Sequence, residues 1–300
     1  MNFEIWGLSG TLATERSSQM SDAEERLWHW VGMFDDACNR FKPNSEISRL
    51  NAAAGQATRA SATLELALDA ALRAFDATGG LCDPTILPAL LALGYDRDYD
   101  ELARDGATDP RPPVPSPGVT AIEFDRKRHT VTLAPGCALD LGAIAKALVC
   151  DLVANDVAAS GGVIVEIGGD VAVRGAGPDG PWAIAVSDSL LLSGDEPRIT
   201  LHTGGVATSS RTTRTWTLGN DVANHIIDPR TGSFAHGEYA TASVTASDCV
   251  IANAFATAAL LWDNDAAHYV AQAGWSARLV RSDGTVEFVG GWPDEGETTS

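Results

Sequence analysis

The sequence is short of basic side chains. Its 300 residues include 21 Lys and Arg against 40 Asp and Glu, so the formal net charge is -19. A surface of that sign repels phosphate backbones and anionic lipid, and we therefore expect no nucleic-acid partner. A ligand with a diphosphate would need a local nest of backbone amides, a basic side chain or a metal ion to reverse the field.

The sequence also lacks a cysteine framework and long apolar runs. Its five cysteines form an odd set with no CxxC pair and no metal-ligand spacing: Cys38, Cys82, Cys137, Cys150 and Cys249. Such a set is unlike a disulfide framework and fits a reducing compartment. No stretch approaches the roughly 18 unbroken apolar residues of a membrane-spanning helix, and the first residues do not resemble a secretory signal. We expect a cytoplasmic protein without membrane insertion.

What is present is a mixture of helical and strand patterns. Apolar periodicity predicts helices over residues 23–41, 61–78, 142–159 and 249–261. Strand-type runs occur at 3–8, 119–124, 130–133, 163–167, 182–186, 199–202, 206–209 and 241–246, with a hairpin around 282–284. Because most strands follow one another, the pattern predicts an α+β fold with a mixed, largely antiparallel central sheet flanked by helices.

The domain organisation is predicted to be simple. We expect one domain over residues 1–293, since no internal repeat interrupts the pattern. Five prolines among charged residues predict a surface insertion at about 96–118 that holds no regular element for long. The polar tail at 294–300 is predicted to be disordered.

Two segments in the first third combine turn residues with polar side chains. In FKPNSEISRLN (residues 41–51), Ser45 and the acids near it fit a helix N-terminus, while Phe41 could present its ring to a planar ligand. In GGLCDPT (residues 79–85), Asp83 fits either a turn before proline or a ligand-binding loop. Each segment alone leaves both interpretations open.

Two further segments place glycine at the junction of a strand or helix. In LDLGAIAK (residues 139–146), Asp140 is either a simple N-cap or, with Lys146, part of a phosphate site at a helix N-terminus. In IVEIGGDVAVRG (residues 164–175), Gly168 and Gly169 fit either a β-bulge or a close approach of the backbone to a ligand.

The last segment is divided between a turn and a helix. NHIIDPRTG (residues 224–232) holds His225 in a turn, where it is a candidate proton acceptor. In CVIANAFATAAL (residues 249–260), Asn253 and Thr257 are one helical turn apart. Their oxygens therefore share a helix face, which suits a hard metal ion and equally an ordinary polar seam.

Taken in order, these segments resemble the ApbE family of FAD:protein FMN transferases. The family signature is similar to SEISRLN, GGxxDPT, a helix with DLGxIAK, a Gly-Gly-Asp strand, HxIDPxTG and a final helix with ADxxxT. The six motifs appear here in that order across residues 41–257. The resemblance covers most of the chain and implies the family's fold.

The resemblance also implies an FAD site. It places Phe41 against the flavin, lines the site with Leu81, Cys82 and Asp83, puts Asp140 and Lys146 at the ribose or diphosphate, and lets Gly168 and Gly169 pass close by. Magnesium would be bound by the backbone oxygen of Ala143 and the side chains of Asn253 and Thr257.

This chain departs from the family at three of these positions. Asn253 stands where the family has aspartate, so the metal site loses one negative charge and should bind magnesium less well. Ala147 and Ser210 replace glycines of many relatives, and we expect altered loop geometry at most.

The implied reaction transfers FMN from FAD to a threonine of an acceptor flavoprotein. The threonine hydroxyl attacks the FMN phosphorus, AMP leaves, His225 takes the proton and Asp228 orients the imidazole. Two alternatives remain open: an FAD-binding protein with weak or lost transferase activity, and an FAD pyrophosphatase that gives FMN and AMP.

Overall fold

The computed structural model describes residues 1–53, 55–105, 111–187 and 196–292. The chain forms two compact units. We call the first the sheet unit; it comprises Met1–His29, Lys146–Thr213 and the chain from His236 onward. The second, Trp30–Ala145 with Arg214–Ala235, we call the helical unit. The predicted tail, 294–300, lies outside the described residues.

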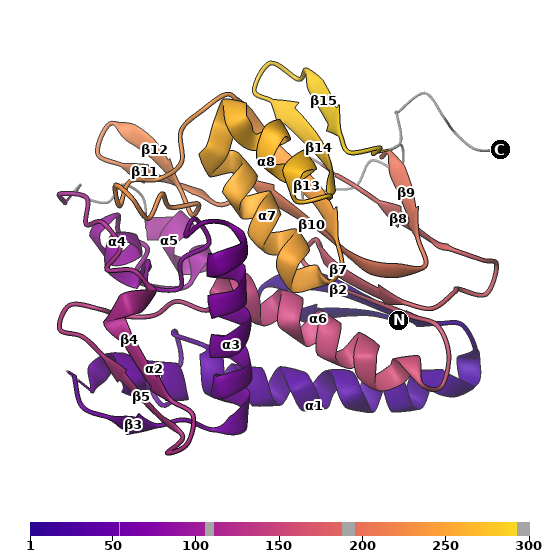
Figure 1. Ribbon diagram of the computed structural model, residues 1–300, viewed down its shortest axis with the longest axis horizontal. Coiled ribbons are helices and arrows are strands. Elements are labelled where there is room, and N and C mark those ends of the chain that lie inside the picture. Colours follow the sequence, from indigo (N-terminus) through magenta and orange to yellow (C-terminus); the bar gives the residue numbers. More distant parts are fainter. Residues whose placement is uncertain (54, 106–110, 188–195, 293–300) are drawn as a thin grey trace. The chain divides into compact units, whose positions relative to one another are not determined.

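The sheet unit is built on eight strands (Figure 1). In spatial order they are β1 (Asn2–Ile5), β2 (Leu8–Thr14), β6 (Val163–Ile167), β7 (Asp170–Arg174), β10 (Thr203–Ser210), β13 (Tyr239–Ala246), β14 (Ser276–Arg281) and β15 (Val286–Val289). Every neighbouring pair is antiparallel. The α+β prediction with a largely antiparallel sheet is confirmed.

The glycine pair that the sequence left ambiguous is a hairpin turn. Ile167 pairs with Asp170, so Gly168 and Gly169 are the two residues joining β6 to β7. Their φ angles are +60° and +89°, and two-residue hairpins favour positive φ at both positions. The β-bulge interpretation is therefore wrong, and the turn fixes Asp170 as the first residue of β7.

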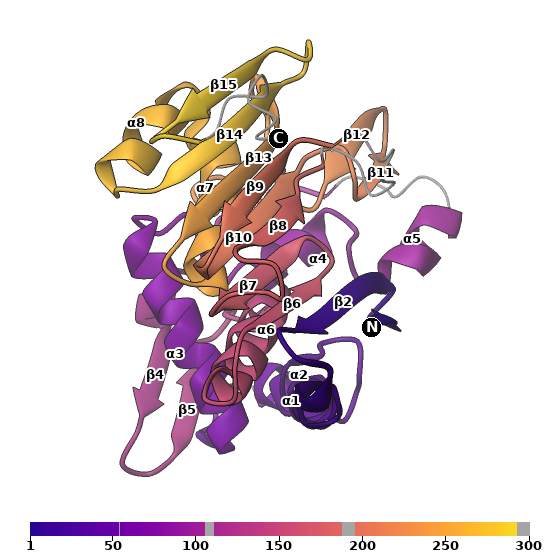
Figure 2. The same ribbon diagram turned by 90° about the vertical axis from the view of Figure 1, so that its right-hand side faces the viewer.

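Strand β10 is buried on both faces. On one face lies helix α7 (Cys249–Trp262), and a Cβ at Gly205 would overlap the backbone of Asp248 and Cys249 where that helix begins. On the other face the hairpin of β8 (Trp182–Ala185) and β9 (Arg198–Leu201) packs through Ile184 and Ile199. Figure 2 shows β8 and β9 on the side of the sheet away from α7.

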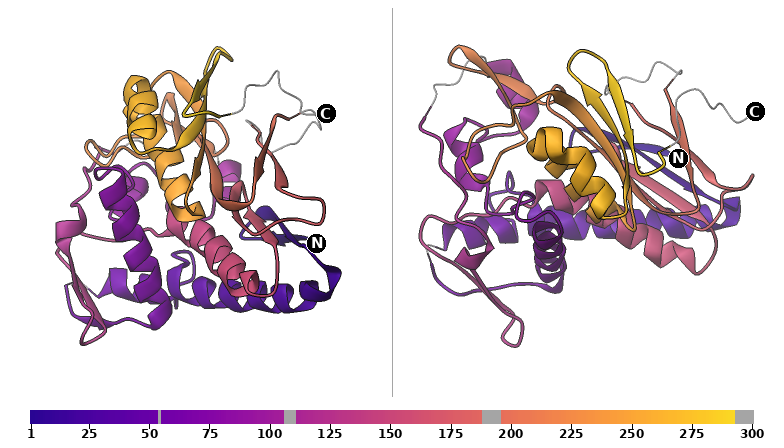
Figure 3. Two further views of the ribbon diagram at one scale, coloured as in Figure 1. Left: turned by 45° about the vertical axis from the view of Figure 1, so that its right-hand side comes forward. Right: turned by 45° about the horizontal axis from the view of Figure 1, so that its top comes forward.

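Three further helices belong wholly or partly to the sheet unit. The boundary between the units falls within α1 (Met20–Cys38) and within α6 (Gly142–Ala158). Helix α8 (Ala266–Gln272) packs against β14 and β15, coloured orange to yellow in Figure 3. No helix in the described ranges is long and apolar enough to span a membrane.

The helical unit contains short elements around their own core. Its helices are α2 (Glu46–Ala52), α3 (Ala62–Ala77), α4 (Leu87–Ala92) and α5 (Tyr99–Asp105). Its strands are β3 (Thr58–Arg59), β4 (Ile122–Asp125) and β5 (Thr130–Leu133), which form one sheet, and the hairpin β11 (Thr215–Leu218) and β12 (Asp221–Asn224). Leu90, Leu102 and Trp216 are buried together in its core.

The proline-rich segment is more structured than its composition indicates. It includes α5, and Leu102 of that helix is fully buried. The Gly118 amide donates to Thr85 Oγ1 over 3.0 Å, and the Ser116 amide donates to the Pro229 carbonyl over 2.9 Å. Both ends of the segment are thus fixed within the helical unit. Residues 106–110 lie outside the described ranges.

Candidate functional site

The sheet unit holds a buried polar cluster of Lys146, Asp170 and Asn253. Lys146, from α6, forms an ion pair with Asp170 Oδ2, and Asn253 Nδ2, from α7, donates to Asp170 Oδ1 over 2.7 Å. The Asp170 side chain is 1% exposed and Asn253 is 6% exposed. The carboxylate is therefore out of water, and its two partners offset part of the desolvation cost.

The oxygen of the Asn253 amide is an exception among buried polar atoms. Oδ1 has no hydrogen-bond partner among the described residues, although its amide nitrogen is bonded. Buried side-chain oxygens are nearly always paired, and an unpaired one calls for a bound water, ion or ligand. Asn253, which its spacing from Thr257 made a candidate metal ligand, thus has a buried oxygen that is available to a ligand.

Thr257 follows one turn later on the same helix. Its Oγ1 lies 3.1 Å from Ser209 Oγ of β10, a pair in which either hydroxyl can donate. If Thr257 receives the proton from Ser209, it keeps a lone pair for another ligand. Asn253 and Thr257 therefore form one oxygen-bearing face of α7, as the spacing predicts.

The donor set fits magnesium only with help from a ligand. Among the described residues no group of three His, Cys, Asp or Glu side chains is arranged to hold a metal ion. The amide oxygen of Asn253 and the hydroxyl of Thr257 are hard donors but carry no charge. Magnesium commonly combines a few protein oxygens with substrate phosphates, and this set suits that arrangement.

In the helical unit, Asp140 is fully engaged by neighbours. Its Oδ1 accepts from the Gly142 amide over 2.7 Å, and its Oδ2 lies 2.6 Å from Arg40 Nε. Both side chains are mostly buried, at 9% exposure for Arg40 and 13% for Asp140. The carboxylate accepts from the first amide of α6, whereas the N-cap position itself is Leu141, whose carbonyl accepts from the Ala145 amide over 2.8 Å. Exposed Ala143 lies in the first turn of that helix.

Arg40 also organises the aromatic side chains near it. Its guanidinium carbon lies 4.1 Å from the centroid of Phe41 and 4.8 Å from that of Tyr95, distances typical of cation–π contacts. Tyr95 in turn packs on Trp216, with centroids 5.4 Å apart. Phe41 remains 39% exposed, so a ring held by Arg40 is free to meet a planar ligand.

The Asp83 loop is a compact turn with a buried carboxyl. Asp83 Oδ1 accepts from the Thr85 amide over 2.8 Å and from Thr85 Oγ1 over 2.7 Å. Burial raises the pKa of Asp83, and the two bonds from Thr85 partly oppose that shift. Burial likewise raises the pKa of Cys82 to about 12, with Asp83 adding to the shift, so the thiol packs rather than reacts. Leu81 beside it is buried.

The predicted catalytic turn also lies in the helical unit. His225 follows β12 and is half-buried. Asp228 is paired with Arg230, whose Nε and Nη2 reach its two oxygens over 2.9 and 2.8 Å. Arg230 thus engages both oxygens of the carboxylate that was predicted to orient His225.

Sequence reasoning missed two residues that the structure brings into these clusters, Arg40 and Asp170. Asp170 belongs to the quoted Gly-Gly-Asp motif but received no role, although a charged residue opening an apolar strand was a signal for one. Arg40 lies directly before the first motif and had no such signal.

The structure accommodates Ala147 and Ser210, which stand where many relatives have glycine. Ala147 is fully buried, and Ser210 ends β10 without positive φ.

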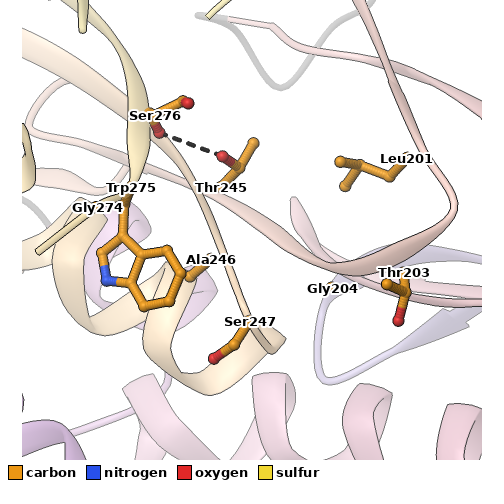
Figure 4. A pocket seen from close by; sticks show the side chains of 9 residues that line it. All are labelled: Leu201, Thr203, Gly204, Thr245, Ala246, Ser247, Gly274, Trp275 and Ser276. Atoms are coloured by element: carbon orange, nitrogen blue, oxygen red, sulfur yellow. Dashed lines mark hydrogen bonds between the residues drawn. The ribbon is translucent and has the colours of Figure 1, made fainter. Parts of the chain in front are cut away.

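A shallow surface hollow of the sheet unit is a separate feature. It is lined by Leu201, Thr203, Gly204, Thr245, Ala246, Ser247, Gly274, Trp275 and Ser276. Figure 4 shows these side chains, with the Thr245 hydroxyl donating to the Ser276 carbonyl. None of them is ionisable, and none belongs to the predicted site. The hollow therefore offers no acid, base or charged ligand.

Comparisons with known proteins agree over most of the chain. The model of the ApbE family matches residues 8–279. A protein named FAD:protein FMN transferase from Chlamydia trachomatis is 31% identical over 236 residues, which cover 75% of this chain and 71% of that protein. One of the same name from Vibrio cholerae is 26% identical over 247 residues, which cover 80% of this chain and 73% of that protein.

Solved structures share the fold. The ApbE protein of Thermotoga maritima superposes with a TM-score of 0.78 and 22% identity, over 96% of each chain. The flavinyl transferase ApbE of Pseudomonas stutzeri, in its apo form, gives a TM-score of 0.77 and 21% identity, over 96% of this chain and 92% of that one. At these identities the likeness concerns the fold alone.

Proposed function

The chain belongs to the ApbE family, and from that premise we propose that it is an enzyme that transfers FMN from FAD to an acceptor flavoprotein. The observation that carries the proposal is the family match over residues 8–279, which includes every motif residue discussed above. The relatives named FAD:protein FMN transferase support the same activity. The buried free thiols of all five cysteines fit a reducing compartment, so we expect the reaction in the cytoplasm.

In the proposed reaction the acceptor atom is a threonine oxygen. The bond formed joins that oxygen to the FMN phosphorus, and the bond broken is the phosphoanhydride of FAD, so AMP leaves. The hydroxyl proton passes to His225. A half-buried histidine suits this role because imidazole changes protonation near neutral pH.

The proposed FAD-binding residues act in different ways. Lys146 has three donors, so it can keep its ion pair with Asp170 and still donate to a diphosphate oxygen. Asp140 has both oxygens engaged, so we assign it the positioning of the first turn of α6, whose free amides favour an anion. Phe41 supplies an exposed ring to the flavin. Leu81, Cys82, Asp83, Gly168 and Gly169 complete the proposed set.

For magnesium we propose the Ala143 carbonyl, Asn253 Oδ1 and Thr257 Oγ1 as protein ligands. The unpaired buried oxygen of Asn253 supports this assignment. When bound, magnesium would neutralise charge on the diphosphate as the phosphoanhydride breaks. Because these protein donors are neutral, the diphosphate has to supply the negative charge that the metal needs.

A direct assay separates transfer from its alternatives. The chain is incubated with FAD, magnesium and a peptide bearing a flavinylation-type threonine, and peptide mass, AMP and free FMN are read together. Transfer predicts a peptide heavier by FMN less one water, and an equal amount of AMP. Free FMN with AMP and an unmodified peptide would establish hydrolysis instead.

The role of His225 is tested in the same assay. We expect His225→Asn to lower the rate of transfer by about 10²–10⁴-fold, the usual contribution of a general base, with FAD affinity retained. The matched control is His202→Asn, which removes an exposed histidine after β9 and should leave the rate unchanged. Equal rates for the His225 variant and wild type would assign the proton to another group.

One alternative is favoured by a specific residue. Asn253 in the metal position favours an FAD-binding protein with weak or lost transferase activity. That alternative predicts bound, intact FAD and no AMP under conditions in which Asn253→Asp restores transfer. A wild-type chain that modifies the peptide at a rate no lower than the variant would exclude it.

A further inference from the structure

Asp170 faces two different donors with its two oxygens. Lys146 Nζ donates to Oδ2, and Asn253 Nδ2 donates to Oδ1. These three side chains come from α6, β7 and α7, so three elements of the sheet unit meet at one carboxylate. Its backbone is held as well, since the Cys150 thiol donates to the Asp170 carbonyl over 3.4 Å.

This arrangement determines which end of the Asn253 amide faces which way. An ionised carboxylate only accepts hydrogen bonds, so the amide group next to it must present NH₂. The amide oxygen then necessarily points away from Asp170. It is this oxygen that is buried without a partner among the described residues.

We propose that Asp170 is a positioning residue that fixes the Asn253 side chain so that Oδ1, and not Nδ2, is presented to the divalent metal. This inference rests on the metal site of the proposed function. An unrestrained amide can turn either end to a cation, and its NH₂ end cannot serve as a ligand. Partners that orient metal ligands commonly matter about 10- to 100-fold in metal affinity.

Lys146 determines how an amide at position 170 would be oriented. The Lys146 ammonium can only donate hydrogen bonds. In the Asp170→Asn variant, the amide at position 170 must therefore turn its oxygen to Lys146 and its NH₂ to Asn253. Asn253 must then flip in order to accept, which turns its own NH₂ toward the metal position. One substitution at 170 therefore reverses the amide at 253 without touching it.

The experiment is a titration with Mn²⁺, followed by electron paramagnetic resonance, on the full chain with and without FAD. We expect Asn253→Ala and Asp170→Asn each to weaken Mn²⁺ binding by about tenfold or more. In the double variant Asn253→Ala with Asp170→Asn the losses should not add, because Asp170 acts through Asn253.

A charge swap supplies the rescue. In Asp170→Asn with Asn253→Asp, the new NH₂ at 170 donates to the new carboxylate at 253, and the second carboxylate oxygen is free for the metal. We expect Mn²⁺ affinity at or above that of wild type. The control Asp156→Asn removes an equal charge from the exposed face of α6 and should change affinity little.

Two results would overturn the inference. If Asp170→Asn weakens Mn²⁺ binding as much in the Asn253→Ala background as in wild type, Asp170 acts by charge alone. If Asn253→Ala binds Mn²⁺ as wild type does, Asn253 is not a ligand. The peptide assay reads the proposed function separately, since transfer can persist on other ligands and the binding pattern can hold in a chain that transfers nothing.

Discussion

Individual buried carboxyls in this chain are held by quite different sets of neighbours. Asp170 has an ammonium and an amide, and Asp151 has two backbone amides and a guanidinium. Asp83 has only the amide and hydroxyl of Thr85. With no cation among these partners, Asp83 is the carboxyl of the three at which burial is least compensated.

The pH dependence of stability should reveal this at Asp83. Burial raises its pKa in the folded state, so the folded protein loses stability as pH rises from the ordinary carboxyl range through the raised pKa. Asp83→Asn keeps an acceptor for Thr85 but does not titrate. We therefore expect the melting temperature of the variant, relative to wild type, to increase between pH 4 and pH 7, as measured by differential scanning calorimetry.

Asp125 provides a control of opposite sign. Hydrogen bonds led by the Arg128 backbone amide lower its pKa, so its contribution to stability is present above the unfolded pKa and is lost as pH falls through the folded pKa. Asp125→Asn should thus melt lower than wild type by a margin that grows toward neutral pH. If the melting temperatures of the two variants, relative to wild type, changed with pH in the same direction, the loss of one negative charge and not the burial of Asp83 would explain both effects.

Replacing Asn253 with the aspartate of the family should destabilise the folded protein when no metal is bound. Asn253→Asp replaces the donor to Asp170 with a second carboxylate in a buried contact, and an unsatisfied buried group costs about 1–3 kcal/mol. We expect a lower free energy of unfolding without metal and a larger gain in melting temperature with Mg²⁺ than in wild type. Asn264→Asp, an exposed site, should show neither effect. A metal-free variant as stable as wild type would contradict the contact.

Among secondary-structure elements, α7 depends on a carboxylate from another helix. Asp151 of α6 accepts from the Cys249 and Val250 amides over 3.0 Å each, and it pairs with Arg174 of β7. It therefore caps the helix that carries Asn253 and Thr257. Asp248, the N-cap residue itself, accepts from the Ile251 amide.

Removing this cap should destabilise the protein. We expect Asp151→Ala to lower the free energy of unfolding by about 2–4 kcal/mol, because two helix amides and a mostly buried Arg174 lose an acceptor. Urea denaturation measures the change. Asp22→Ala breaks an exposed pair with Arg26 and should cost no more than about 0.5 kcal/mol. A similar small loss for Asp151→Ala would mean that water replaces the carboxylate.

The elements that sequence predicted well are those with long apolar periodicity. Helices at 142–159 and 249–261 match α6 and α7 within one residue at each end, and the strands at 130–133 and 163–167 match β5 and β6. Short elements such as α4, α8 and β11 were missed, and α2 was indicated only by Ser45 at its N-terminus. A seven-residue helix such as α2 contains two turns, too few for a periodic signal, and it is held by its Ser45 cap and by packing.

At the scale of the whole molecule, the sequence indicated the sheet but not its order. β2 pairs with β6, which lies about half the chain away, and β10 pairs with both β7 and β13. Such pairings depend on which faces become buried together, and local periodicity does not record that. The same limit applies to the site: motifs named Asn253 and Lys146, whereas the carboxylate that joins them became evident only from the pairing of β6 with β7.

The net charge of -19 should slow the association of FAD with the protein. Lys146 is already paired with Asp170 and Arg40 with Asp140, so the cations proposed near the ligand do little to offset the acidic field. That field repels an anionic dinucleotide, and salt screens it over about 10 Å at 0.1 M. At saturating Mg²⁺, raising KCl from about 20 to about 200 mM should therefore speed FAD association, by a factor of about 2–5 in stopped-flow fluorescence.

Riboflavin is the control for this effect, because it has no phosphate and its association should change little with salt. If salt instead slows FAD association, a local positive potential, such as Lys146 released from Asp170, outweighs the field of the whole chain.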